Sequence, residues 1–465
     1  MSGGRLRALA AALPVALVLA ACGDGGSGGE DGKLLFWSIE DTADRVQTQK
    51  RILAEFTEKT GIETELVAVA ENQLTTVLSS AAASGDLPDV IGAVSLPIMS
   101  QLRTDDLLDT DAAADVVATL GADTFAEQAL ELTREDDTQL VVPSDGWAQL
   151  LFYRKDLFAA AGLEPPTSYE AIRTAAERLD QGDTAGITAS TTPADVFTHQ
   201  TFEHLALANG CQLVDDGGQV ALDSPECVEA FGFYADLIRD HSVAGNQDVD
   251  TTRATYFAGK SAMVIWSSFL LDELAGLRKD ALPTCPECAA DPAFLAKNTG
   301  VVAALTGPDG AEPTTFGETT SFALLDRTGD GATDDAKALV EYLMGEGYQD
   351  WLAVAPEGKI PVRAGTKDDP EAHIEAWRAL DAGVDTKAPL SKFYDAETLR
   401  IVEESPETFS RWGFPQGRAE LAGAVAGQLV VPKTLAELIN GSGDPESAAG
   451  DASERAATIA DELGQ

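Results

Sequence analysis

The chain has 465 residues, 44% of them hydrophobic, and 77 acidic against 32 basic side chains give it a formal net charge of −45. This composition excludes a disordered chain, because the acidic residues stand among apolar periodicities and not in blocks. The charge excludes nucleic acid as a partner by repulsion, and the length predicts two or three lobes in place of a single core. A solvated acidic surface is enough to explain the charge, so the charge alone predicts no function.

The first 21 residues are typical of a secretory signal peptide. Arg5 and Arg7 precede an apolar stretch over residues 8–21 that is too short to span a bilayer. The stretch ends in Leu19-Ala20-Ala21-Cys22, which resembles a lipobox, where small residues admit the signal peptidase and the thiol accepts diacylglycerol. We expect residues 1–21 to be removed and Cys22 to anchor a mature extracytoplasmic protein to the cell membrane. The alternative is an ordinary signal peptide with an incidental cysteine.

Residues 22–32 are predicted to form a flexible tether, because GDGGSGGEDG after Cys22 has six glycines and no apolar side chain. The globular body then begins with strand-like runs at 33–37, 63–69 and 89–92. Helical spacing of apolar residues, ending at Gly61 and at Gly85, predicts a helix between each pair of strands. This alternation predicts an α/β fold with a parallel sheet covered by helices on both faces.

Later segments continue the alternation of helices and strands. A new pattern starts after residues 143–148, so we expect the chain to change lobes there. Thr167 and Glu170 form a capping box that predicts a helix start, and Ser224 before Pro225 predicts another. A polar linker over 441–450 is predicted to precede a last amphipathic helix.

Four cysteines remain once Cys22 is assigned to lipid, an even number that suits an oxidising compartment. We pair Cys211 with Cys227, across an apparent turn before a helix, and Cys285 with Cys288, within a tight loop. A zinc site made of four thiolates is one alternative, and a thioredoxin-like redox motif at the second pair is another.

Catalytic and metal-binding motifs are missing. The sequence has no G-x-S-x-G, H-E-x-x-H or Walker-type pattern and only four histidines. His199 and His204 are spaced poorly for metal ligation on a helix, so we expect them at the surface or the edge of the core. Residues 326–331 begin like a calcium loop, but Lys337 occupies the position of the closing acid. We expect no metal, no cofactor and no enzymatic activity.

Aromatic residues lie near the presumed ends of strands and loops, where ligands of doubly wound sheets bind. Their flat faces suit sugar rings, while sugar hydroxyls need carboxylate or amide partners. The aromatic candidates are Trp37, Trp147, Trp266 and Trp412, and the polar candidates close to them are Glu40, Asp145, Glu318 and Thr319. A place in the hydrophobic core is the alternative for each tryptophan.

Four segments in register carry a resemblance to a known family. They are residues 151–170 (LFYRKDLFAAAGLEPPTSYE), 256–265 (YFAGKSAMVI), 316–325 (FGETTSFALL) and 347–363, which ends in GKIPVR. In these segments the chain resembles the extracellular solute-binding proteins of ABC importers, the group that includes maltose-binding protein. The resemblance covers almost the whole mature chain.

The resemblance implies a two-lobed α/β fold of the periplasmic-binding-protein type (type II), hinged by crossover strands, with a solute cleft between the lobes. We expect lobe 1 to comprise 33–142 and 320–362, lobe 2 to comprise 143–319 and 363–440, and 441–465 to form an acidic tail with a terminal helix. By position, the resemblance places these residues in the cleft: Trp37, Glu40, Asp145, Trp147, Glu318, Thr319, Thr320, either Trp266 or Phe269, and, with looser alignment, Trp412 and Phe414.

The implied function is that of a monomeric receptor that delivers a small solute to a membrane permease. A mono- or oligosaccharide is the leading solute, and a cationic solute is an alternative because several candidate residues are acidic. The competing function is a secreted lipoprotein glycoside hydrolase that uses Glu40 and Asp145 as its paired acids.

Overall fold

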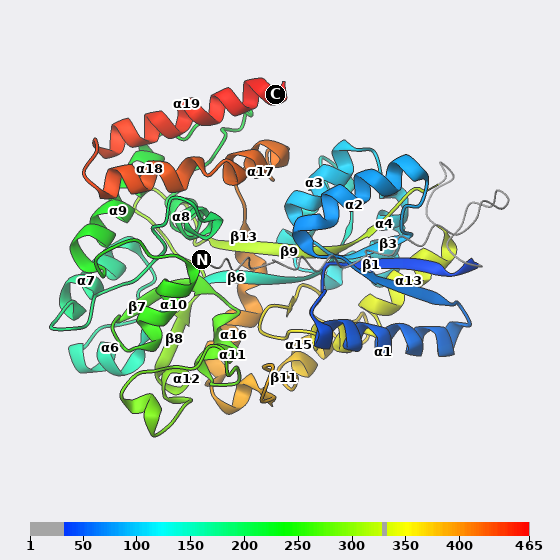
Figure 1. The fold of residues 1–465 in the computed structure, drawn as a ribbon, viewed down its shortest axis with the longest axis horizontal. Helices are drawn as coiled ribbons and strands as arrows, with labels where there is room; N and C mark the ends of the chain where they lie inside the picture. Colours follow the sequence, from blue (N-terminus) through cyan, green and yellow to red (C-terminus); the bar gives the residue numbers. More distant parts are fainter. Residues whose placement is uncertain (1–31, 328–332, 465) are drawn as a thin grey trace, which may run out of the picture.

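The computed structural model describes residues 32–327 and 333–464 and shows two lobes side by side (Figure 1). Two long strands, β6 (Val142–Arg154) and β9 (Thr315–Leu324), run from one lobe into the other. Residues 1–31, which include the expected signal peptide, Cys22 and nearly all of the tether, lie outside the described residues. Residues 328–331 of the calcium-like loop also lie outside the described residues.

Lobe 1 is built on the parallel strands β1 (Leu34–Ser38), β2 (Thr64–Ala68) and β3 (Val90–Val94), with β1 in the middle. The parallel pattern predicted for this region is thus confirmed. β9 adds to β3 in the antiparallel direction and β6 adds to β9, so the complete sheet is mixed. The other elements of lobe 1 are α1 (Ala43–Thr60), α2 (Glu71–Ser84), α3 (Leu96–Thr104), α4 (Thr110–Leu120), α5 (Glu127–Leu132), β4 (Arg134–Glu135), β5 (Thr138–Gln139), α13 (Asp334–Met344) and α14 (Tyr348–Leu352).

Lobe 2 is built on the second half of β6. There β7 (Met263–Ser267) and β8 (Thr299–Val302) both pair with it in the antiparallel direction. The helices around these strands are α6 (Lys155–Ala161), α7 (Tyr169–Leu179), α8 (Val196–Ala208), α9 (Pro225–His241), α10 (Val249–Phe257), α11 (Leu270–Leu274), α12 (Phe294–Asn298), α16 (Ala396–Glu404), α17 (Ala419–Gly427), α18 (Val430–Ile439) and α19 (Pro445–Leu463).

Short elements connect the lobes or border both. They are β10 (Ile360–Pro361), α15 (Ala372–Trp377), β11 (Asp381–Ala382), β12 (Ala388–Pro389) and β13 (Phe409–Ser410). β10 pairs with β6 and β13 pairs with β9, so both crossover strands carry an additional partner. Single 3₁₀ turns occur at Ala122–Thr124, Glu287–Ala289, Leu390–Lys392 and Ser405–Thr408.

Most helix boundaries follow from local chemistry. α1 and α2 end at Gly61 and Gly85, whose φ angles of 78° and 79° favour glycine. α9 begins as predicted, with the Ser224 side chain accepting a hydrogen bond from the amide of Cys227. The predicted capping box at Thr167 is wrong by one residue, because Ser168 is the N-cap of α7 and its hydroxyl accepts from the amide of Ala171.

Both predicted disulfides are present in lobe 2. Cys211 and Cys227 join the end of α8 to the first turn of α9, with a Cα–Cα distance of 4.5 Å. Cys285 and Cys288 close a short loop, with a Cα–Cα distance of 4.9 Å. The pairing excludes a zinc site made of these four thiolates.

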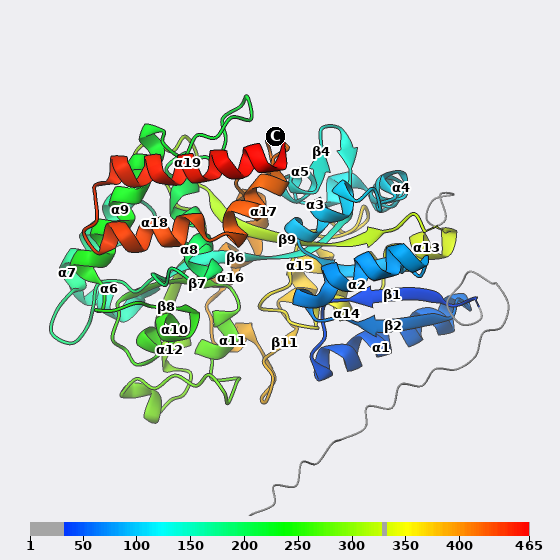
Figure 2. The same ribbon diagram turned by 45° about the horizontal axis from the view of Figure 1, so that its top comes forward.

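The C-terminal tail packs onto lobe 2, where α19 contacts α9 and α18 (Figures 1 and 2). Its capping box at Asp444 and Ser447 starts the helix at Pro445, so the polar linker is shorter than the predicted 441–450. The contact of α9 with α19 is close, since a Cβ on Gly232 would lie 3.2 Å from the Pro445 side chain.

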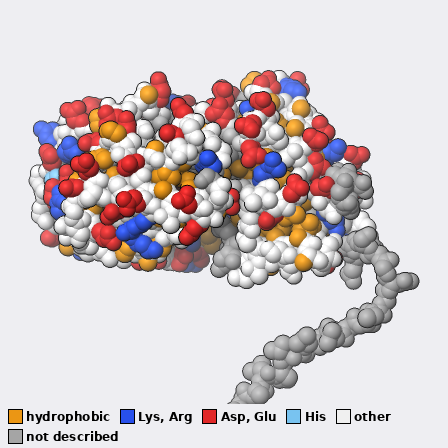
Figure 3. All heavy atoms as spheres, turned by 90° about the horizontal axis from the view of Figure 1, so that it is seen from above, with side chains coloured by type: hydrophobic (Ala, Val, Ile, Leu, Met, Phe, Trp, Pro, Cys, Tyr) orange, Lys and Arg blue, Asp and Glu red, His pale blue; other side chains and the backbone are white. Residues whose placement is uncertain are grey.

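The acidic side chains are spread over both lobes on the face seen in Figure 3, with lysines and arginines among them. Within the described part of the chain, no single helix has both the length and the hydropathy to cross a membrane. α17 and α18 meet these criteria only when taken together, and they meet at a bend of 49°.

Candidate functional site

A cavity of about 560 Å³ lies between the lobes, with the two crossover strands as its floor. Asp145 and Trp147 of β6 and Glu318 and Thr320 of β9 line this floor. Asp145 stands opposite Thr320 and Trp147 opposite Glu318 in the strand register. Because alternate residues and directly opposed residues share one face of a sheet, all four side chains project into the same space.

The walls of the cavity come from both lobes. Lobe 1 contributes Glu40 and Ile39 after β1, Arg45 in α1, and Ala93, Ser95 and Pro97 around the start of α3. Lobe 2 contributes Val196, His199 and Gln200 of α8, Phe269 after β7, Arg411 and Phe414 after β13, and one side of α17. The connecting segment before β10 contributes Ala355, Gly358 and Lys359. We call this cavity the interlobe cleft.

The structure brings together six of the residues proposed from the sequence, which are Glu40, Asp145, Trp147, Phe269, Glu318 and Thr320. Phe414, the looser candidate, also lines the cleft. Four others are packed elsewhere, namely Trp37, Trp266, Thr319 and Trp412. Strand alternation explains the place of Thr319 outside the cleft. It lies between two cleft residues of β9, so its side chain is on the opposite face of the sheet, where it is fully buried.

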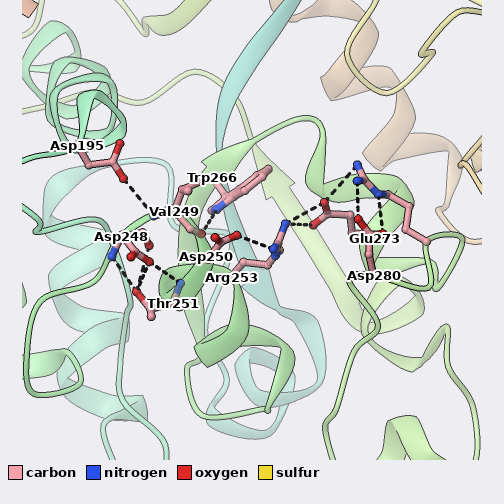
Figure 4. A network of polar contacts seen from close by, with 10 residues as sticks. Asp195, Asp248, Val249, Asp250, Thr251, Arg253, Trp266, Glu273 and Asp280 are labelled. Atoms are coloured by element: carbon pink, nitrogen blue, oxygen red, sulfur yellow. Dashed lines mark hydrogen bonds and ion pairs between the residues drawn. The ribbon is translucent and has the colours of Figure 1, made fainter. Parts of the chain in front are cut away.

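The three tryptophans outside the cleft have core positions. Trp266 packs beside Phe197, and its indole nitrogen donates to the carbonyl of Val249 at 3.1 Å (Figure 4). The indole of Trp412 donates to the carbonyl of Cys211 at 2.9 Å, next to a disulfide. Trp37 is buried in β1. Of the two aromatic residues proposed after Met263, Phe269 is therefore the one that faces the cleft.

A first network of charges joins lobe 1 to the floor. The Glu40 carboxylate contacts Arg45 at 2.7 Å and the Lys359 ammonium at 2.8 Å. Lys359 also contacts Asp145 at 3.1 Å and lies 4.6 Å from the centre of the Trp351 ring. The other oxygen of Asp145 accepts from the Trp351 indole at 2.8 Å and from the Ser144 hydroxyl at 2.6 Å.

These contacts determine which groups are ionised. Burial alone would raise the pKa of Glu40, but Lys359 and Arg45 lower it below the usual value. Burial likewise opposes the charge on Lys359, yet Asp145 and Glu40 raise its pKa above the usual value. Glu40 and Lys359 are therefore both charged at neutral pH.

A second network lies on the side of lobe 2. The Arg411 guanidinium contacts Glu318 and, at 3.2 Å, Glu203 of α8. Glu203 also contacts Nε2 of His199 at 3.2 Å and accepts from the amide of Trp412 at 2.8 Å. Burial alone would raise the pKa of Glu203, but Arg411 and His199 lower it below the usual value.

The start of α3 also reaches this network, because the amide of Leu96 donates to Glu318 at 2.7 Å. A carboxylate at a helix N-terminus complements the positive end of the helix dipole. Glu318 thereby connects α3 of lobe 1 with Arg411 of lobe 2.

The charges that line the cleft balance. Three carboxylates, Glu40, Asp145 and Glu318, face three basic side chains, Arg45, Lys359 and Arg411. Aromatic rings complete the floor, where Trp147 lies 5.8 Å from Phe316 and 6.4 Å from Phe269 between ring centres. The side chains that line the cleft thus offer flat apolar surface and equal numbers of acidic and basic groups, while Glu203, which shares Arg411 with Glu318, is buried behind this wall. Within the described residues there is no group of three or more side chains suited to hold a metal ion.

The basic partners of the cleft carboxylates were not among the site residues predicted from the sequence. Lys359 stands inside the motif GKIPVR and Arg411 stands next to Trp412, but neither was proposed for the site. His199 was expected at the surface or the core edge, whereas its side chain is buried at the wall of the cleft.

Comparison with known proteins places the chain in a family. The family model described as bacterial extracellular solute-binding protein matches residues 40–350. The chain belongs to this family. Its members are binding proteins that work outside the cytoplasm, so the location of this chain is extracytoplasmic.

Individual relatives agree with the family match. The chain is 27% identical over 317 residues to the putative ABC transporter periplasmic-binding protein YcjN of Escherichia coli, covering 67% of this chain and 69% of YcjN. Among solved structures, the fold is similar to the cyclic alpha-maltosyl-1,6-maltose binding protein of Arthrobacter globiformis, with a TM-score of 0.69, 19% identity and coverage of 92% and 98%. It is also similar to UgpB of Mycobacterium tuberculosis, with a TM-score of 0.67, 16% identity and coverage of 94% and 100%. These likenesses establish the two-lobed fold expected from the sequence.

Proposed function

We propose that this chain is the solute receptor of an ABC importer and that it captures an uncharged, hydroxyl-rich solute, a mono- or oligosaccharide, in the interlobe cleft. The observation that carries the proposal is the charge-balanced cleft with Trp147 and Phe269 on its floor. Sugar rings pack their C–H faces on such aromatic surfaces, and their hydroxyls find fixed donors and acceptors in the two networks.

The names of two relatives support the same function. YcjN is named as a component of an ABC transporter, and the Arthrobacter protein is named for a cyclic maltosyl-maltose ligand. UgpB was solved with glycerophosphocholine, so a solute other than a sugar is within the range of this fold. We infer a membrane permease as the partner and a monomer as the working form.

The geometry argues against the two alternatives. A glycoside hydrolase needs one carboxyl group that donates a proton, but Glu40 and Asp145 share the Lys359 ammonium and the pKa of Glu40 is lowered. A cationic solute needs uncompensated negative charge, but each carboxylate at the cleft surface contacts a basic side chain. We therefore propose a binding protein without catalytic activity.

We also propose that the lobes move as two bodies about the crossover strands. Lobe 1 then comprises residues 33–142 and 320–362, and lobe 2 comprises 143–319 and 363–440. The strands β6 and β9 and the segment before β10 contribute both to the floor of the cleft and to the connection. A solute bound on this floor would contact both lobes and favour closure.

Replacing Trp147 with alanine is expected to weaken sugar binding by about tenfold or more, because the ring is the largest apolar surface on the floor. The measurement is calorimetric titration with maltose, maltotetraose, arabinose and ribitol, supported by thermal shift. A solute at 100 times its Kd should stabilise the wild type by about 2.7 kcal/mol.

The matched control is Phe393→Ala, since Phe393 is also a partly buried aromatic but lies outside the cleft. Binding of an amino acid or polyamine in place of every sugar would show the solute class to be wrong and leave the receptor function intact. Turnover of a chromogenic glycoside that disappears in Asp145→Asn would overturn the proposal.

We propose that Cys22 anchors the receptor and that the tether to Gly32 lets it reorient beside its permease. Cys22→Ala is expected to release the protein from the membrane fraction and to reduce uptake, while solute affinity stays within about twofold of the wild type. Fractionation and calorimetry on the same preparations test this. Retention of Cys22→Ala in the membrane, or a large loss of its affinity, would contradict the assignment.

A further inference from the structure

The side of α17 that borders the interlobe cleft consists of small residues. Ala422, Gly423, Ala426 and Gly427 line the cavity, while Leu421 and Val425 of the same helix are buried. The spacing of four between Ala422 and Ala426, and between Gly423 and Gly427, places these residues on one side of the helix. α17 also contacts α3 of lobe 1 (Figure 2), so this wall stands at the meeting of the two lobes.

Neither backbone conformation nor packing explains the two glycines. Both have negative φ, and the left-handed residue of the turn into α18 is Leu429, with φ of 58°. A Cβ added to Gly423 or Gly427 would meet nothing within 4 Å. A glycine inside a helix is less stable than alanine, so Gly423 lowers the stability of α17 without any contact within the chain that requires it.

Open space at a helical glycine is not sufficient by itself, since Gly450 in α19 has it too. What distinguishes α17 is its place in the cleft together with a second observation on α8. The side chain of His199 lines the same cavity, and its Nδ1 atom is buried with no hydrogen-bond partner in residues 32–327 and 333–464.

The surroundings of His199 define what would satisfy this atom. Nε2 faces the Glu203 carboxylate at 3.2 Å and therefore carries a proton, which leaves Nδ1 as the ring nitrogen without a partner among the described residues. The ring packs edge-on against Trp412 with the centres 5.6 Å apart, so it is held in place. A buried polar atom without a partner costs free energy, and a hydroxyl of a bound solute, which can both donate and accept, would supply one.

We propose that the small-residue face of α17 and Nδ1 of His199 form a subsite for a second sugar ring, so that the solute is an oligosaccharide. The first ring lies on the floor at Trp147, and the second lies against the bare backbone of α17 at Gly423 and forms a hydroxyl hydrogen bond with Nδ1 of His199. The inference rests on the proposed function, whose site it extends.

The test compares sugars of two lengths on the mature chain by calorimetry. The probes are glucose with maltose and maltotetraose, and arabinose with arabinotriose. In at least one series, the wild type is expected to bind the longer sugar about tenfold or more tighter than its monosaccharide. Gly423→Leu should remove this advantage and leave the monosaccharide Kd within about twofold of the wild type.

Three further variants separate binding from folding. Gly450→Leu is the matched control, since it adds the same side chain to a helical glycine with open space outside the cleft, and it should change neither Kd. Gly423→Ala should raise the melting temperature of the free protein, because alanine favours the helix, and yet weaken the longer sugar. His199→Phe keeps a ring against Trp412 and should also weaken the longer sugar selectively.

The inference is overturned if the wild type binds monosaccharides as tightly as their oligomers, or if Gly423→Leu retains full affinity for the longer sugar. Failure of the proposed function gives a different result, because the wild type then binds no sugar of either length. That result would also overturn the subsite.

Discussion

Lys359→Met is expected to lower the free energy of unfolding by about 3–5 kcal/mol, the usual cost of removing one partner from a buried ion pair. The Lys359 side chain is only 3% exposed, and its ammonium lies 2.8 Å from Glu40 and 3.1 Å from Asp145. Methionine fills the space of the lysine stem but leaves the buried Asp145 without a cation and leaves Glu40 with Arg45 alone. Solute binding should be lost as well, because both carboxylates line the floor or wall of the cleft.

Urea unfolding followed by tryptophan fluorescence measures the loss. The control is Lys279→Met, whose side chain is 76% exposed and 3.6 Å from Asp385; it should change stability by no more than about 0.5 kcal/mol. In the wild type the pKa of Glu40 is lowered, so its contribution is present at neutral pH and is lost as the pH falls through that pKa. The deficit of Lys359→Met should therefore shrink in acid. An equal deficit at pH 4 and pH 7 would contradict this account.

Local patterns predict much of the fold because the chemistry that ends an element is local. Gly61 and Gly85 end their helices with left-handed φ angles, and Ser224 caps α9, each as its own segment of sequence indicates. The error at Thr167 has the same origin, since Thr167 and Ser168 are both capable caps and tertiary contacts decide between them. One such contact is the amide of Tyr169, which donates to the carbonyl of Thr306 in a distant segment.

The site is less predictable because its members meet through strand pairing. Lys359 reaches Asp145 because β10 pairs with β6, which places Ile360 opposite Gly146. No local feature of the sequence around Lys359 predicts that pairing of β10 with β6. Strand alternation could have excluded Thr319, since Glu318 and Thr320 were already proposed for the same face. The core position of Trp412 depends on the carbonyl of Cys211, which only the folded chain brings near.

Asp272→Asn is expected to change how stability depends on pH. Asp272 in α11 is fully buried, and neither of its carboxylate oxygens has a hydrogen-bond partner within the described part of the chain. Burial raises its pKa to about 9, and the charges of Glu357 and Glu273 add to the rise, while Arg278 opposes it. Burial also raises the pKa of Glu357. Glu273 itself contacts Arg253 at 3.1 Å (Figure 4) and Arg278 at 3.6 Å. Among the described residues, Asp272 therefore has no ion-pair partner of its own.

The direction in which stability changes with pH follows from the number of protons that each state binds. The folded chain holds a proton on Asp272 up to about pH 9, whereas the unfolded chain releases it near pH 4. Between these values the folded state binds more protons, so wild-type stability falls as the pH rises, by up to about 1.4 kcal/mol per pH unit from this group. Asparagine cannot titrate, and the variant should lose that slope, with near-equal stability at pH 5 and greater stability than the wild type at pH 8.5.

Urea unfolding from pH 5 to pH 8.5 measures the slope for both proteins. Asp240→Asn is the control, because that side chain is 57% exposed at the end of α9, and its curve should run parallel to the wild type. A parallel curve for Asp272→Asn would mean that water or a counterion reaches the carboxylate and that it is ionised in the folded state. Phe269 precedes Asp272 by three residues and Gly358 follows Glu357, and both line the cleft, where they pack closely together. Access of water to Asp272 would therefore also expose the connection between the lobes to solvent.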